Sequence, residues 1–205
     1  MTVLVTYLDS SVVWFEVEAA VTSRVPLVGV TWLQHTRVQR LLDSIDVAFV
    51  PFRTDLFPRA VPGTASALAV HLFLVNCDDP DLYKTSVKKQ LADWLAVVAA
   101  KKNQEPLIVY LSAPDAGRKQ ASSRLFGSSV FDKIKSDFNK TALINLKPTH
   151  PKDETIWTDF FIKLRELILS SFNGKLLQYD EDTRRLDAQR LLPGWNYCQF
   201  FILKV

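Results

Sequence analysis

The sequence predicts an α/β domain with a doubly wound, mostly parallel sheet that has helices on both faces. Ala67–Val75 reads ALAVHLFLV, a near-continuous apolar run that is typical of a central strand buried on both faces. Apolar runs of this kind alternate with helical patterns along most of the chain, as in proteins built from strand–helix–strand units. With 205 residues, of which 48% are hydrophobic and 23% charged, the chain can bury a sizeable core.

The first third of the chain predicts two strands separated by a helix. Val3–Leu8 is a short apolar run closed by an aspartate and two serines, which predicts a strand followed by a helix N-cap. Ser11–Val25 favours a helix, although its β-branched residues leave a strand as the alternative. Ile45–Phe52 predicts the second strand, and Pro51 favours an edge position because proline cannot donate to a ladder. Arg53–Ser66 is expected to be an exposed loop with an antiparallel strand nearby.

The remaining elements are expected to alternate between helix and strand. They are a helix at Leu82–Ala100, a strand at Leu107–Leu111, a helix at Val130–Phe138, a strand at Ala142–Leu146 and a helix at Thr155–Phe172. Asn173 and Gly174 would end the last helix with a left-handed cap. We therefore expect one α/β domain over residues 1–174, followed by a helical extension over 175–205.

The turn after the first strand lacks the residues that a nucleotide site needs. Ligands of open α/β sheets bind at the carboxyl ends of the strands, where a glycine-rich loop and a lysine hold phosphates. Here the turn contains Asp9, Ser10 and Ser11, and neither GxxxxGK[ST] nor GxGxxG occurs in the chain. Asn139 begins a sequence that resembles the guanine-reading NKxD motif, but Ala142 stands where the aspartate would be. The sequence therefore predicts no nucleotide site, no catalytic residue and no cofactor.

An acidic cluster after the central strand is the best candidate for a metal site. Asp78, Asp79 and Asp81 could hold Mg²⁺, which prefers carboxylate oxygens. The favoured interpretation is that one of them caps the following helix and the others stabilise its positive end. A divergent nucleotide- or Mg-binding enzyme remains the alternative to a non-catalytic protein.

Histidines and cysteines give no sign of catalysis or of metal binding. His71 lies in the apolar strand run and is expected to be a core histidine with satisfied hydrogen bonds. His35 and His150 are not accompanied by a GxSxG nucleophile motif. Cys77 and Cys198 lie in apolar stretches without metal-ligand spacing, so both are expected to be buried thiols.

The charge balance argues against nucleic acid as a partner, because 25 Lys and Arg against 22 Asp and Glu give a net charge of only +3. Lys84, Lys88 and Lys89 are interpreted as a solvated helix face, and direct contact with a GTPase or a membrane surface is the alternative. No signal peptide or transmembrane segment is recognised, so a cytosolic location is expected.

The last residues of the chain are the candidate interaction site. The apolar tail is too short to bury itself, so it should pack on this domain or on residues elsewhere. The candidate interaction residues are Pro193, Gly194, Trp195, Phe200 and Phe201.

Four stretches resemble the amino-terminal region of one family, in the family's own order. They are DLYKTSVKKQLADWL (Asp81–Leu95), SVFDKIKSDF (Ser129–Phe138), WTDFFIKLRELILSSF (Trp157–Phe172) and PGWNYCQFF (Pro193–Phe201). The family is subunit 10 of the transport protein particle (TRAPP) complex, called subunit 130 in yeast.

The resemblance implies a non-catalytic scaffold. Family members are longer, with an α-solenoid and β-sandwich domains after this region, so residues 175–205 would begin a truncated solenoid. Their first domain is similar to a small GTPase that has lost its nucleotide site. Subunit 10 belongs to TRAPP II, a tethering and exchange-factor complex for Rab11-type GTPases on trans-Golgi membranes, whose exchange residues lie in other subunits. The implied partners are small longin-like and sedlin-like adaptors and the other large TRAPP II subunit.

Overall fold

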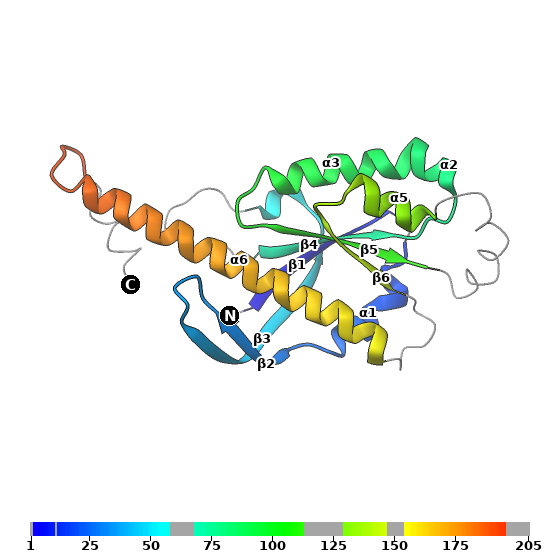
Figure 1. The fold of residues 1–205 in the computed structure, drawn as a ribbon, viewed down its shortest axis with the longest axis horizontal. Coiled ribbons are helices and arrows are strands. Elements are labelled where there is room, and N and C mark those ends of the chain that lie inside the picture. The colour runs from blue at the N-terminus through cyan, green and yellow to red at the C-terminus, as the bar shows by residue number, and fades with distance from the viewer. Residues whose placement is uncertain (1, 11, 58–67, 113–128, 147–153, 196–205) are drawn as a thin grey trace.

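The computed structural model of the chain describes residues 2–10, 12–57, 68–112, 129–146 and 154–195. These residues form a six-stranded sheet in the order β2-β3-β1-β4-β5-β6, with helices on both faces (Figure 1). β2 is antiparallel to β3, and all the other neighbouring strands are parallel. The predicted α/β class and the mostly parallel sheet are therefore confirmed.

All the strands except β2 overlap the predicted apolar runs. The six strands are β1 (Thr2–Asp9), β2 (Leu27–Leu33), β3 (Gln39–Pro51), β4 (Leu68–Val75), β5 (Glu105–Leu111) and β6 (Ala142–Leu146). All eight residues of β4 are buried, as expected for a strand between two layers of helices. The central strand of the prediction thus forms the centre of the sheet.

The helices form two outer layers. They are α1 (Trp14–Thr22), α2 (Pro80–Leu82), α3 (Lys88–Ala99), α5 (Val130–Asp137) and α6 (Glu154–Ala188), with a π-helical turn η2 (Tyr83–Val87) between α2 and α3 and a 3-10 turn η1 (Thr54–Leu56). α1 and α6 cover one face of the sheet. The continuous α2–η2–α3 segment and α5 cover the other face.

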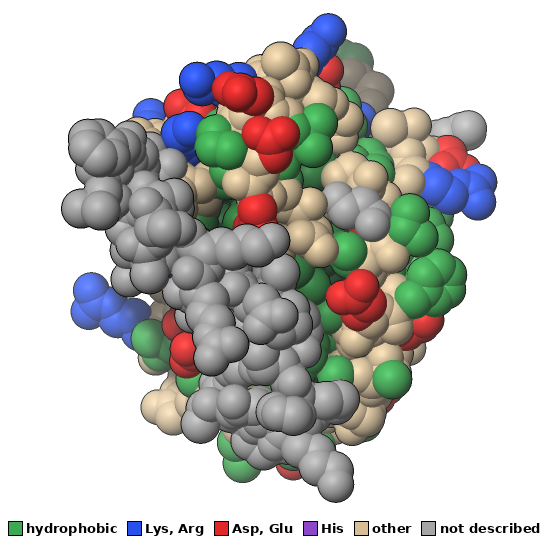
Figure 2. All heavy atoms as spheres, turned by 90° about the vertical axis from the view of Figure 1, so that its right-hand side faces the viewer, with side chains coloured by type: hydrophobic (Ala, Val, Ile, Leu, Met, Phe, Trp, Pro, Cys, Tyr) green, Lys and Arg blue, Asp and Glu red, His purple; other side chains and the backbone are tan. Residues whose placement is uncertain are grey.

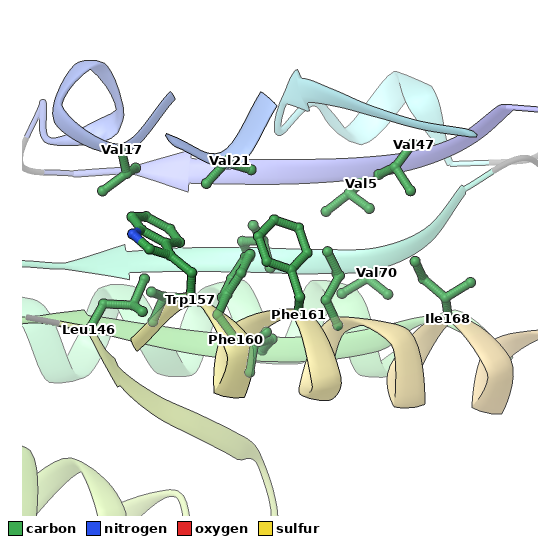
Figure 3. Close-up of a cluster of buried hydrophobic side chains, with 14 of the residues drawn as sticks. Val5, Val17, Val21, Val47, Val70, Leu146, Trp157, Phe160, Phe161 and Ile168 are labelled. Carbon is green, nitrogen blue, oxygen red and sulfur yellow. The ribbon is translucent and has the colours of Figure 1, made fainter. Parts of the chain in front are cut away.

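The larger of two hydrophobic clusters lies between the sheet and α6 (Figure 3). Trp157, Phe160 and Phe161 come from the first turns of α6 and point toward the valines of the sheet, among them Val5 and Val70. The apolar residues of α6 recur at helical spacing, so one side of the helix can be buried along the sheet. This packing fixes α6 against the sheet.

The strand β2 was not predicted, and the predicted edge position of Ile45–Phe52 is wrong. β2 and β3 form an antiparallel hairpin in which β2 is the edge strand, so β3 lies inside the sheet. Pro51 is tolerated because it is the last residue of β3, opposite Tyr7, where the ladder ends. The antiparallel strand was expected near Arg53–Ser66, and the part of that range that the structure describes forms only a 3-10 turn.

The predicted cap at Asn173 and Gly174 is also wrong, because α6 continues through both residues to Ala188. Gly174 has a packing role instead, since a Cβ there would collide with the side chain of Asn103. The predicted division into residues 1–174 and 175–205 falls in the middle of this helix, and the division itself stays a prediction.

Candidate functional site

Asp9 occupies the N-terminus of α1, at the carboxyl end of β1. It is the last residue of β1, and its carboxylate accepts hydrogen bonds from the backbone N–H groups of Val13 (Oδ1, 3.1 Å) and Trp14 (Oδ2, 2.7 Å). N–H groups at a helix N-terminus form a general anion-binding site. Here the chain's own carboxylate takes that position from a residue before the helix, whereas the N-cap residue itself is Val13, which makes no side-chain cap.

Aromatic side chains fill the space beneath this turn. Tyr7 and Trp14 stack with ring centroids 4.0 Å apart, and Phe49 of β3 lies 5.6 Å from Trp14. Burial raises the pKa of the Tyr7 hydroxyl, and the carboxylates of Glu18 and Asp9 raise it further. The turn after β1 is therefore packed against aromatic rings and does not form an open phosphate-binding loop.

The acidic cluster after β4 is used within the protein. The Asp79 side chain accepts a hydrogen bond from the N–H of Asp81 at 2.9 Å, so the predicted helix cap is confirmed. Asp78 accepts a hydrogen bond from the Tyr110 hydroxyl at 2.8 Å, and burial raises the pKa of that hydroxyl. Within the described ranges, no three His, Cys, Asp or Glu side chains are grouped to hold a metal ion. The geometry gives the magnesium alternative no support.

His71 is a buried core histidine, as predicted. Its Nδ1 lies 2.7 Å from the Thr6 hydroxyl, and its Nε2 lies 3.0 Å from Oε1 of Gln104. A neutral ring with its proton on Nε2 satisfies both contacts. Burial is the main cause that lowers the pKa of His71 to about 4; the Lys175 charge acts in the same direction, and the hydrogen bond with Gln104 opposes it. A fully buried, neutral imidazole cannot reach a substrate.

Of the remaining histidines and cysteines, the structure describes His35 and Cys77, and both have roles in packing or in contacts within the chain. Nε2 of His35 lies 2.9 Å from Oδ2 of Asp180 on α6, which joins the β2–β3 hairpin to that helix. Cys77 is buried, as predicted. His150 and Cys198 lie outside the described residues.

The C-terminal half of α6 projects beyond the sheet (Figure 1), and the described candidate interaction residues, Pro193, Gly194 and Trp195, follow its end. Pro193 and Gly194 are exposed, and Trp195 folds back so that its Nε1 donates to the carbonyl oxygen of Leu186 at 2.5 Å. Two leucines that the sequence analysis missed are also exposed here, Leu191 by 90% and Leu192 by 60%. Their position directly before a Pro-Gly turn was the available signal.

Phe200 and Phe201, the other two predicted interaction residues, lie outside the described residues. The assignment of an interaction site to residues 193–201 stays a prediction.

The carboxyl edge of the sheet also exposes apolar side chains, as the view onto that edge shows (Figure 2). Val12 and Phe15, at the start of α1, are 71% and 76% exposed, and Leu82 beside the acidic cluster is 50% exposed. Both hydrophobic and acidic side chains are visible on the part of this face that the structure describes. Among the described helices, none is long and apolar enough to span a bilayer.

Together these features define a three-layer α/β domain in which the chain's own side chains occupy the carboxyl ends of the first strands. Residues 1–190 match the family described as "Trafficking protein particle complex subunit 10-like, N-terminal". The chain belongs to this family. No solved structure matches it.

Several relatives carry corresponding names. The chain is 28% identical to Trafficking protein particle complex subunit 10 of Dictyostelium discoideum over 98% of its own length and 16% of the relative's. It is 33% identical to the Homo sapiens subunit 10 over 76% of its length and 13% of the relative's. Over 64% of its length and 10% of the relative's, it is 34% identical to the Trafficking protein particle complex II-specific subunit 130 homolog of Oryza sativa. The chain therefore spans less than a fifth of each of these relatives.

Proposed function

We propose that this chain is a non-catalytic assembly domain of a TRAPP II-type tethering and Rab exchange-factor complex in Golgi vesicle traffic. The observation that carries the proposal is the Asp9 carboxylate, which occupies the helix N-terminus that a phosphate would need. The names of the relatives, TRAPP complex subunit 10 and TRAPP II-specific subunit 130, support the type of complex.

The fold supports a small-GTPase-like domain that has lost its nucleotide site. A mostly parallel sheet with one antiparallel edge strand and helices on both faces suits such a topology. The turn after β1 has no glycine and no lysine, and aromatic rings pack beneath it. A domain of this kind works by contact with partners instead of turnover.

The proposed partners are other TRAPP subunits, namely small longin-like and sedlin-like adaptors and the other large TRAPP II subunit. A Rab11-type GTPase would be served indirectly, through exchange residues in other subunits. The protein would be cytoplasmic and peripherally associated with trans-Golgi membranes. Leu191 and Leu192, with Pro193 and Gly194, offer an exposed apolar end of α6 for such contacts.

Calorimetry with GDP, GTP and Mg²⁺ tests the non-catalytic part of the proposal. We expect no binding heat, because the helix N-terminus is already occupied by a carboxylate. Micromolar affinity for either nucleotide would contradict it.

Co-purification with the other TRAPP subunits tests the assembly part. Leu191→Ser with Leu192→Ser should weaken co-purification, because both side chains would lose apolar contact with a partner. Leu177→Ser, at a half-exposed leucine further back on α6, is the matched control and should change less. Equal recovery of partners by both variants would exclude this end of α6 as the contact.

A further inference from the structure

Within the described segments 80–102 and 129–141, which form one face of the molecule with α2–η2–α3 and α5, lysine is the only basic residue type. Residues 80–102 and 129–141 contain eight lysines, no arginine and four aspartates. This leaves an excess of four positive charges, compared with +3 for the whole chain. We call this surface the lysine face, and its lysines are Lys84, Lys88, Lys89, Lys101, Lys102, Lys133, Lys135 and Lys140.

The packing of α3 against α5 brings together lysines that are far apart in the sequence. The two helices lie side by side on the same face of the sheet (Figure 1). Asp137 of α5 accepts a hydrogen bond from the Tyr83 hydroxyl at 2.7 Å and lies 2.9 Å from the Lys88 ammonium. These contacts hold the pKa of Asp137 below its usual value and fix α5 beside the longer helix.

Most of these lysines point into solvent. All are exposed except Lys133, which is half-buried. Lys88 is paired with Asp137, and Lys101 lies 5.8 Å from the ring centre of Phe57. None of the ion pairs among the described residues involves Lys84, Lys89 or Lys135. The lysine face therefore presents exposed ammonium groups to solvent, and Lys84, Lys89 and Lys135 are available to an approaching anion.

The composition of the lysine face distinguishes between two kinds of acidic partner. Protein interfaces are enriched in arginine and aromatic residues and depleted in lysine. The described part of the lysine face exposes no aromatic side chain; its exposed apolar residues are small or aliphatic, among them Ala92, Ala96, Val97 and Leu82. Lysine is a hydrated point charge that needs no fixed partner geometry, which suits a fluid layer of anionic headgroups.

We propose that the lysine face docks electrostatically on an anionic membrane surface. Each lysine near such a surface strengthens binding about fivefold. The attraction acts only within about 8 Å at physiological ionic strength, so a flat cluster on one side of the molecule is needed. This proposal does not rest on the proposed function, because it uses only the charge distribution of the chain.

Vesicle sedimentation with the full chain tests the proposal. We expect binding to vesicles of phosphatidylcholine mixed with phosphatidylserine, none to phosphatidylcholine alone, and release as salt is raised. The triple variant Lys84→Gln, Lys89→Gln and Lys135→Gln should bind the anionic vesicles about 100-fold more weakly.

A second triple variant, Arg40→Gln, Arg184→Gln and Arg190→Gln, is the matched control. It removes the same number of charges from exposed positions away from the lysine face. It should lose no more than about fivefold, and circular dichroism should show both variants folded.

Two results would overturn membrane docking. One is that the wild-type chain does not sediment with the anionic vesicles. An acidic protein would then remain as the ligand of the lysines. The other is an equal loss of binding in both triple variants, because net charge alone would then explain the attraction.

Discussion

The Asp9 carboxylate occupies the N-terminus of α1, where an external anion could otherwise bind. Its contribution to the free energy of unfolding can be measured. Asp9→Ala leaves the N–H groups of Val13 and Trp14 without their acceptor, so the free energy of unfolding should fall by about 1–2 kcal/mol. Urea denaturation measures this change. Asp9→Asn keeps one acceptor oxygen and should lose less. An alanine variant as stable as the wild type would show that the carboxylate is not the cap that the geometry implies.

His71 makes stability depend on pH in a defined window. Its pKa is about 4 in the folded protein and 6.5 when unperturbed, so between these values the unfolded chain binds more protons. The free energy of unfolding should therefore fall as the pH drops from 6.5 to 4, by up to about 3 kcal/mol. Urea denaturation across this range measures the slope. His71→Gln should flatten it, and an unchanged slope in that variant would assign the effect to other groups.

Glycine is required at position 174 because the Asn103 side chain packs against it, and not because the helix ends there. Gly174→Ala would gain about 1 kcal/mol of helix propensity but displace the Asn103 side chain, which donates to Gln178 at 2.7 Å. We expect little net change in the wild type and the full gain in an Asn103→Gly background, where glycine suits the φ of 60° at that position. A double-mutant cycle from urea denaturation should give a coupling of about 1 kcal/mol. Additive effects would contradict the clash.

At the scale of elements, the β2–β3 hairpin is held to α6 by a small set of polar contacts. Asn173 accepts from Trp32 Nε1 and donates to the carbonyl oxygen of Leu33, both at 3.0 Å. Asn173→Ala should therefore speed amide hydrogen exchange in β2 and the hairpin tip, with a stability loss of about 2 kcal/mol. Gln90→Ala, which removes a side-chain hydrogen bond on α3, should leave that exchange unchanged. If amide exchange in β2 stayed slow in Asn173→Ala, pairing with β3 alone would hold the hairpin in place.

Elements with one dominant pattern could be predicted from the sequence. β4 is an unbroken apolar run, and α3 shows helical spacing, so both were placed to within a few residues. β2 was missed because Gly29, with a φ of 60°, interrupts its alternation. The end of α6 was misplaced because a local glycine signal does not reveal contact with a loop 71 positions earlier in the chain, at Asn103.

For the candidate site, an absence was easier to predict than a surface. The missing phosphate loop and the cap at Asp79 follow from residues that are adjacent in the chain. The lysine face combines the α2–η2–α3 segment with α5, which packs beside it on the same face of the sheet, so Lys84 and Lys135 could not be grouped before the fold was known. Leu191 and Leu192 are exposed because they lie just beyond the end of α6, and the following Pro193 and Gly194 were the signal for this in the sequence.

At the scale of the whole molecule, α6 joins the sheet to the chain beyond it. Lys175 donates to the carbonyl oxygen of Leu68 at 2.7 Å, and Asp180 holds His35. A chain cut after residue 174 should therefore be less stable than one cut after residue 190, by roughly 2–3 kcal/mol. Thermal unfolding of the two fragments measures this difference. Equal stabilities would support the predicted domain boundary at residue 174.

Because α6 is one continuous helix, the direction of its projecting end is set by its packing on the sheet. Its first turns are anchored under the sheet by Trp157 and Phe160, and residues 175–188 continue for about 20 Å without a hinge. A subunit bound at the far end of α6 would be held at an orientation set by the sheet, and by any bilayer on which the sheet rests.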